Sequence, residues 1–226
     1  MCDHTVWDSQ IAALSDIAES HVVEWGMEHA SLVKMAEAAL AAAPEKFALA
    51  GHSMGGRVAF EVYRLAPERV TRIAVMNTGV VPRAEGSVGD EEERGRRRLL
   101  DIAFKEGIRP MALEWLKGMI PGHRMGDTKL TEDIIQMFER KTPELFLVQQ
   151  EALLGRRDAR PVLGQIQCPA LVLTGGDDVW STPAAHEKIA EGIAGSQLVI
   201  VPKSGHMSTM EWPHDVAAAM RDWLTA

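Results

Sequence analysis

The chain has 226 residues, of which 46% are hydrophobic and 25% are charged, a composition that fits one globular α/β domain with a smaller inserted part. Its formal net charge of −8 argues against a nucleic acid or an anionic membrane as a partner. Only two cysteines are present, no apolar run reaches membrane-spanning length, and the first ten residues lack signal-peptide features, so we expect a cytoplasmic protein.

The first 81 residues alternate between helical and strand patterns. Apolar side chains at helical intervals, with helix-stopping residues such as Pro44, predict three helices, at 5–17, 31–43 and 55–66. Short apolar runs bounded by turn residues predict three strands, at His21–Trp25, 46–51 and 70–78. This alternation predicts right-handed βαβ units and a parallel sheet.

The strand pattern stops near residue 82 and returns near residue 165. Helical segments fill the stretch between, and the pattern then predicts strands at 168–176 and 197–205 and helices at 183–194 and 211–225. We therefore predict an α/β core, residues 1–81 and 165–226, with a mostly parallel sheet flanked by helices. Residues 82–164 are predicted to form a helical cap inserted into this core.

The predicted cap contains a charged run, DEEERGRRRLLDIAF, at 90–104, which raises the question of a nucleic-acid surface. The spacing favours a solvated helix, because three acid–base pairs lie four residues apart with the acid on the N-terminal side. These pairs are Asp90–Arg94, Glu92–Arg96 and Glu93–Arg97.

The stretch Gly51-His52-Ser53-Met54-Gly55 follows a predicted buried strand and precedes a predicted helix. In this setting G-x-S-x-G forms a sharp turn that presents the serine hydroxyl at the carboxyl edge of the sheet. The N-terminus of the helix favours negative charge that develops there. Ser53 is therefore our candidate nucleophile; the alternative is a small residue in a tight turn.

A serine nucleophile at neutral pH needs a base, and the base needs an acid that orients it. His206 follows the last predicted strand and lies at the same sheet edge, unlike the other histidines, so we predict that it is the base. Asp177 and Asp178 both follow the strand at 168–176 and compete for the role of acid. The spacing before Ser181 favours Asp178.

The chain order Ser53, Asp178, His206 is typical of α/β-hydrolases. Three stretches of the sequence resemble the small esterase and C–C hydrolase type of that family: LAGHSMGGRVAFEVYRLAPERVTRIAVMNT, CPALVLTGGDDVWSTPAAHEKIA and LVIVPKSGHMSTMEWPHDVAAAMRDWL. The resemblance places the acid on Asp178 within GGDDVWST. It implies a Ser-His-Asp triad acting on a small-molecule substrate, with no cofactor and no metal.

The resemblance also implies an oxyanion hole made by two backbone N–H groups, one of them from Met54. In the family the second comes from a loop after the third strand, and neither that loop nor that strand is recognisable in this sequence. Because the loss of one donor lowers kcat by about 10²–10³-fold, we expect reduced activity or none.

Without that third strand, the strand at 46–51 has an edge of unpaired N–H and C=O groups. Three arrangements would resolve this. Either the natural chain starts upstream of Met1, or the strand at His21–Trp25 pairs directly with the strand at 46–51, or a second subunit covers the edge in a homodimer. We expect a truncated relative whose remaining strands close up or which dimerises.

Two functional hypotheses follow. The first is a serine hydrolase that cleaves an ester or similar activated carbonyl compound through an acyl-enzyme, or an acyltransferase with the same three residues. The second is a weak or non-catalytic scaffold that associates through its sheet edge.

Several apolar side chains are candidates for the lining of a substrate pocket, or else for the hydrophobic core: Met111, Trp115, Met119, Phe138, Trp180 and Met207.

Overall fold

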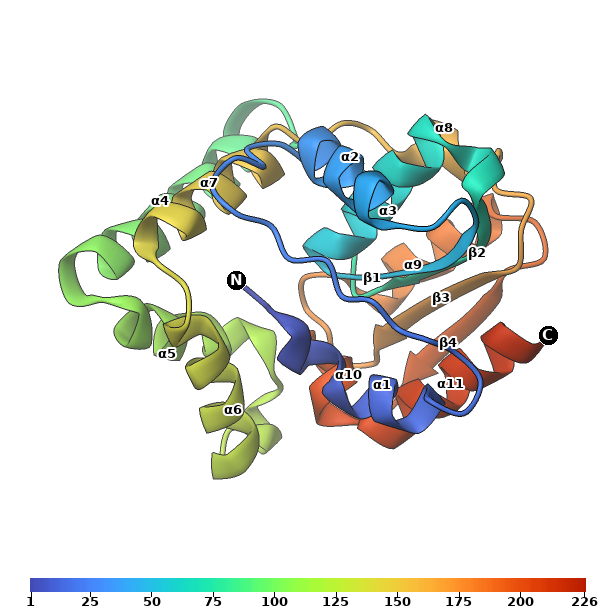
Figure 1. Ribbon diagram of the computed structural model, residues 1–226. Helices are drawn as coiled ribbons and strands as arrows, with labels where there is room; N and C mark the ends of the chain where they lie inside the picture. Colours follow the sequence, from blue (N-terminus) through green and yellow to red (C-terminus); the bar gives the residue numbers. More distant parts are fainter.

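A computed structural model describes all 226 residues and shows a four-stranded parallel sheet between layers of helices (Figure 1). The strands lie in chain order across the sheet: β1 (Phe47–His52), β2 (Val70–Met76), β3 (Ala170–Gly175) and β4 (Gln197–Val201). The register sets Gly51 opposite Val75 and Val172 opposite Leu198. These four predicted strands and the predicted α/β class are confirmed.

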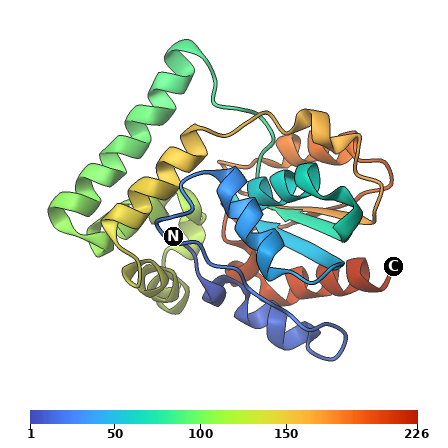
Figure 2. The same ribbon diagram turned by 45° about the horizontal axis from the view of Figure 1, so that its top comes forward.

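Alternate residues of the strands pack against different helical layers. Ile73 and Val75 of β2 pack against the layer formed by α2 (Leu32–Ala42), α3 (Met54–Leu65), α8 (Arg160–Leu163) and α9 (Pro183–Gly192). Ala74 and Met76 face the layer formed by α1 (Asp8–Leu14) and α11 (Pro213–Thr225). Figure 2 shows the two layers on either side of the sheet. Burial on both faces explains why the central strands β2 and β3 are largely continuous apolar runs.

The residues between β2 and β3 form a helical layer beside the sheet, on the left in Figure 1. It comprises α4 (Gly86–Glu106), α5 (Ile108–Met119), α6 (Thr128–Glu139) and α7 (Pro143–Leu154). Its apolar side chains form a cluster of their own, which also contains Met1, Val6 and Met207. The exact division into a core and a cap at residues 82 and 164 stays a prediction. No helix combines the length and the apolar character needed to cross a membrane.

The predicted ion pairs along α4 form only in part. Glu92 pairs with Arg96 at 2.9 Å and Glu93 with Arg97 at 2.7 Å, as predicted. The predicted Asp90–Arg94 pair is wrong, because Asp90 binds Arg83 instead, at 3.2 Å, and Arg94 binds Glu91. Asp90 therefore ties the start of α4 to the chain that leads into it, while Arg94 pairs with Glu91 along the helix.

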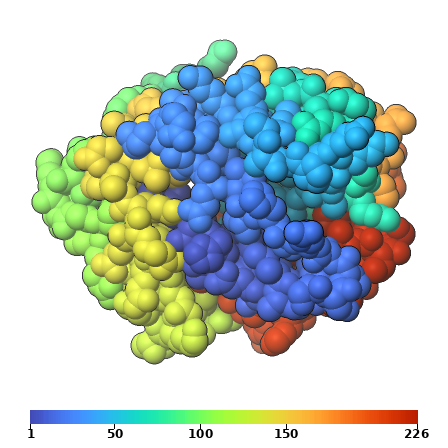
Figure 3. All heavy atoms as spheres, in the orientation of Figure 1, coloured from blue at the N-terminus to red at the C-terminus, as the bar shows by residue number.

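The predicted strand at His21–Trp25 is wrong. Residues 19–25 are extended but make no backbone–backbone hydrogen bond, so the segment does not pair with β1. Side chains hold it instead: Glu24 accepts from Lys141 of the cap at 2.7 Å, and the Trp25 indole donates to Met35 O at 3.2 Å. Figure 3 shows the N-terminal residues spread across the face of the molecule in front of the sheet.

Two predicted helices have different bounds. The helix predicted at 5–17 consists of a 3₁₀ turn, His4–Trp7, followed by α1, which ends at Leu14. The helix predicted at 211–225 consists of α10 (Ser208–Glu211) and α11, which begins at Pro213. Proline has no N–H to donate and fits the first position of a helix, so it starts a new helix here.

Candidate functional site

Ser53 lies in a strained turn between β1 and α3. Its backbone has φ 55° and ψ −117°, in a region that residues other than glycine rarely adopt. The turn is tight, because a Cβ on Gly51 would lie 2.3 Å from the carbonyl oxygen of Gly55. Strain of this kind persists only where the surrounding fold imposes it, and here it presents the Ser53 hydroxyl above the sheet edge.

Gly51→Ala is expected to destabilise the fold by about 1–3 kcal/mol, because the new Cβ overlaps main-chain atoms that cannot move without opening the turn. The matched control is Gly55→Ala, whose Cβ would meet only the Trp25 ring, at 3.9 Å. This control lies within α3 and should change stability by no more than about 1 kcal/mol. Urea unfolding of the two variants measures the difference; equal midpoints would contradict the prediction.

The structure brings Ser53, His206 and Asp178 together. Ser53 Oγ lies 2.8 Å from His206 Nε2, and His206 Nδ1 lies 2.9 Å from Asp178 Oδ2. A carboxylate only accepts hydrogen bonds, so His206 Nδ1 carries the proton and Nε2 is free to accept from the Ser53 hydroxyl. This is the arrangement of a nucleophile, a base and an orienting acid; the catalytic roles themselves stay predictions.

Asp178 is 2% exposed and all of its acceptor positions are used. Oδ2 accepts from His206 and from Asn77 Nδ2, and Oδ1 accepts from the backbone N–H groups of Trp180 and Ser181, each at 2.9 Å. Burial alone would raise the pKa of Asp178, but the bond and charge of His206, aided by the other donors, hold it below its usual value. Its competitor, Asp177, is exposed.

Asn77 and Thr78, which follow β2, form hydrogen bonds to residues of the site. The sequence analysis did not identify either of them. Asn77 is fully buried at φ 47°, and its Nδ2 donates to Asp178 and, at 3.1 Å, to Gly205 O. The Thr78 hydroxyl donates to Ser53 O at 2.7 Å. Their position in the sequence could have indicated this role, because both polar residues follow a buried strand at the same sheet edge as the predicted acid and base.

The backbone of His206 is held from both sides. Its N–H donates to Met119 O, at the end of α5, at 2.8 Å. Its C=O accepts from Nε2 of His52, the residue before the nucleophile, at 2.7 Å. Burial, followed by the nearby charge of His206, lowers the pKa of His52 to about 4. His52 is therefore neutral at pH 7 and adds no positive charge beside the predicted base.

Glu211 supports the His206 loop from α10. Glu211 is 4% exposed, and its carboxylate forms no ion pair. The carboxylate accepts from the N–H groups on both sides of His206, Gly205 at 2.9 Å and Met207 at 3.0 Å. Burial raises the pKa of Glu211 to about 7 despite these two bonds. Sequence reasoning missed it; the only signal was an acidic residue five positions after the predicted base.

Met54 is the first residue of α3, so its N–H has no acceptor within the helix and is available beside Ser53. This is the position from which the predicted oxyanion donor would act. The second donor stays unassigned.

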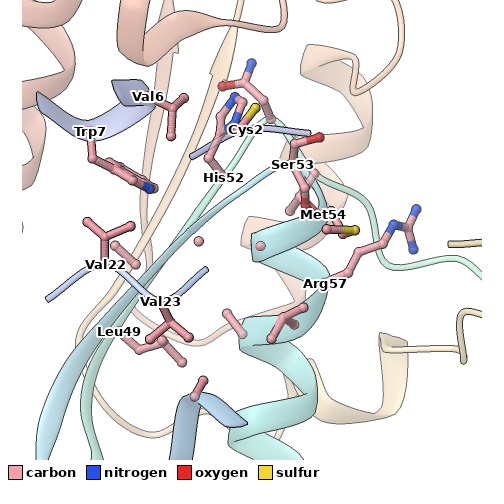
Figure 4. A pocket seen from close by; sticks show the side chains of 18 of the residues that line it. Cys2, Val6, Trp7, Val22, Val23, Leu49, His52, Ser53, Met54 and Arg57 are labelled. Carbon is pink, nitrogen blue, oxygen red and sulfur yellow. Dashed lines mark hydrogen bonds between the residues drawn. The ribbon is translucent and has the colours of Figure 1, made fainter. Parts of the chain in front are cut away.

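A cavity of about 1600 Å³ reaches Ser53 and runs along the free edge of β1. Figure 4 shows Val22, Val23 and Trp7 beside this edge, with Ser53 and His52 at the end of β1. Five of the six candidate pocket residues line the cavity: Trp115, Met119, Phe138, Trp180 and Met207. Met111 does not; it is fully buried in the cap, two helical turns before Met119 and about 12 Å further along α5.

A family model described as the alpha/beta hydrolase family matches residues 7–219. The chain belongs to the alpha/beta hydrolase family. The resemblance seen in the sequence is thereby confirmed.

This alpha/beta hydrolase is 28% identical to a pimeloyl-(acyl-carrier protein) methyl ester esterase of Pectobacterium carotovorum, over 92% of this chain and 84% of the relative. It is 30% identical to a 2-hydroxy-6-oxo-6-phenylhexa-2,4-dienoate hydrolase of Comamonas testosteroni, over 74% of this chain and 58% of the relative. A solved thermophilic esterase from Thermogutta terrifontis, with malate bound, superposes with a TM-score of 0.83 at 29% identity, covering 99% of this chain and 86% of that one. The chain spans 45% to 68% of the length of four other curated relatives.

Proposed function

We propose that this alpha/beta hydrolase is a serine hydrolase that cleaves an ester or a similar activated carbonyl compound through an acyl-enzyme. The observation that carries the proposal is the unbroken contact from Ser53 Oγ through the His206 ring to Asp178. The names of the relatives and the esterase superposition support the same class of reaction.

In the proposed reaction, Ser53 Oγ attacks the substrate carbonyl carbon while His206 Nε2 takes the hydroxyl proton. Asp178 holds the ring in the required tautomer and stabilises its positive charge. The Met54 N–H donates to the oxyanion of the tetrahedral intermediate. His206 then protonates the leaving group, and water, deprotonated by the same nitrogen, cleaves the acyl–Ser53 bond. An alcohol in place of water would give acyl transfer.

A fluorophosphonate probe tests the proposal before any substrate is known. Intact-mass analysis should show a single adduct on the wild-type protein and none on Ser53→Ala, because only an activated serine displaces the fluoride. Circular dichroism must show that both proteins are folded. A folded wild-type protein that takes up no adduct, or an adduct that persists in Ser53→Ala, contradicts the proposal and favours a non-catalytic scaffold.

A further inference from the structure

One wall of the cavity that contains Ser53 carries an excess of positive charge. Arg57 of α3, Arg96 of α4 and Arg156, which follows α7, all line this cavity. Glu92 of α4 is the only carboxylate bonded to any of them. The pairing expected from sequence on a solvated helix face is therefore part of a cavity wall.

Two of the three arginines share Glu92. Arg156 binds it with both ends of its guanidinium, each at 2.7 Å, and Arg96 binds the same carboxylate at 2.9 Å. Burial would raise the pKa of Glu92, but the bonds from Arg156 and Arg96 lower it to about 2. Its single negative charge is thus fully engaged by these two partners.

Arg57 has no acidic partner. Nη1 donates to Val81 O at 3.0 Å, which is the only hydrogen bond of its side chain. Burial, and then repulsion from Arg156, lower its pKa to about 9, so the guanidinium is still charged at neutral pH. Arg57 is half-buried and lines the cavity, and its remaining N–H groups have no acceptor within the protein.

Arg57 is also close to the nucleophile. It lies four residues after Ser53, one turn further along α3, and Figure 4 shows its side chain leaving the helix beside Met54. A group bound by the guanidinium would be in the same cavity as a carbonyl carbon placed at Ser53.

We infer that the substrate carries a carboxylate, separated from its reacting carbonyl group by a short chain, and that Arg57 binds this carboxylate. The inference deepens the proposed hydrolase function and rests on it. The planar fork of arginine matches the two oxygens of a carboxylate, and the cavity supplies no other unpaired cation of this kind beside Ser53. Half-esters of dicarboxylic acids are the simplest compounds of this class.

Binding can be measured without catalysis, by calorimetric titration of glutarate into Ser53→Ala. We expect binding to weaken by about 10- to 100-fold when Arg57→Met is added, since a hydrogen bond to a charged group is lost while the apolar stem is kept. Arg57→Lys, which keeps the charge without the fork, should lie between the two. Arg97→Met is the matched control on the exposed side of α4. Equal affinity in all variants, or tighter binding of inorganic phosphate or glutaramide than of glutarate, overturns the inference.

Hydrolysis gives a second readout, with monomethyl glutarate compared with the neutral ester methyl pentanoate. The ratio of their kcat/KM values should favour the half-ester in the wild-type protein and fall by about 10- to 100-fold in Arg57→Met. If the protein hydrolyses these esters and Arg57→Met leaves the ratio of the kcat/KM values unchanged, the inference is overturned and the proposed function is not. Glutarate binding that depends on Arg57, without hydrolysis of either ester, contradicts the proposed function alone.

Discussion

Asp178→Asn is expected to lower kcat by about 10⁴-fold, the largest effect of any conservative substitution outside the nucleophile and base. The carboxylate accepts the Nδ1 proton of His206 and thereby leaves Nε2 free for Ser53. An amide whose oxygen accepts from the Trp180 and Ser181 N–H groups, as Oδ1 of Asp178 does, would turn its NH2 group toward the ring. The ring would then favour the other tautomer, in which Nε2 is protonated and cannot act as a base.

Asp177→Asn is the matched control, one position earlier on an exposed side chain. Steady-state kinetics on any ester that the protein hydrolyses compares the two variants, with near-UV circular dichroism to verify folding. Only the change at Asp178 should affect kcat. A comparable loss in both variants, or a larger one in Asp177→Asn, would show that the wrong carboxylate has been assigned.

Glu211→Gln is expected to change the pH dependence of stability. The pKa of Glu211 is raised from 4.5 to about 7 in the folded protein, so the folded state binds a proton that the unfolded state has released between these values. Stability from this group is therefore fully present below pH 4.5 and lost as the pH rises through 7. The loss amounts to about 3 kcal/mol, and Gln at this position removes it.

His52 acts in the opposite direction, because its lowered pKa makes the folded protein more stable as the pH rises from about 4 to 6.5. The two contributions partly cancel in the free energy of unfolding of the wild-type protein. The informative quantity is therefore the difference in free energy of unfolding between the wild type and Glu211→Gln at each pH. Urea unfolding at a series of pH values should show this difference changing between pH 4.5 and 8. Glu187→Gln, on the exposed side of α9, is the control substitution of the same type. A constant difference for Glu211→Gln would refute the prediction.

The sequence was most informative where local patterns decide the structure. The Ser53 turn and the loops of Asp178 and His206 each follow a buried strand, and the carboxyl ends of parallel strands meet at one edge of a sheet. The strand pattern alone therefore predicts that these three loops lie at the same edge of the sheet. The choice between Asp177 and Asp178 depended on spacing, and the structure orients Asp178 toward His206.

The parts that failed depend on contacts between distant segments. The run His21–Trp25 has the composition of a strand, but a strand also requires a neighbour with which to pair, and this segment has none. Met111 and Met119 share the apolar face of α5, and only the packing of the cap decides which of them reaches the cavity. Asn77 acts through hydrogen bonds to Asp178 and Gly205, which lie far away in the chain. Glu211 acts through bonds to the nearby loop of His206, and the periodicity of apolar residues encodes neither arrangement.

The bond from His206 N–H to Met119 O joins the predicted base directly to the last turn of α5. Gly205 is packed just as closely against the same segment, since a Cβ there would lie 2.7 Å from Pro121 Cδ. A displacement of α5 would therefore act on the loop that carries His206 through this bond and this contact. The position of the predicted base is thus mechanically coupled to the helical layer that borders the cavity.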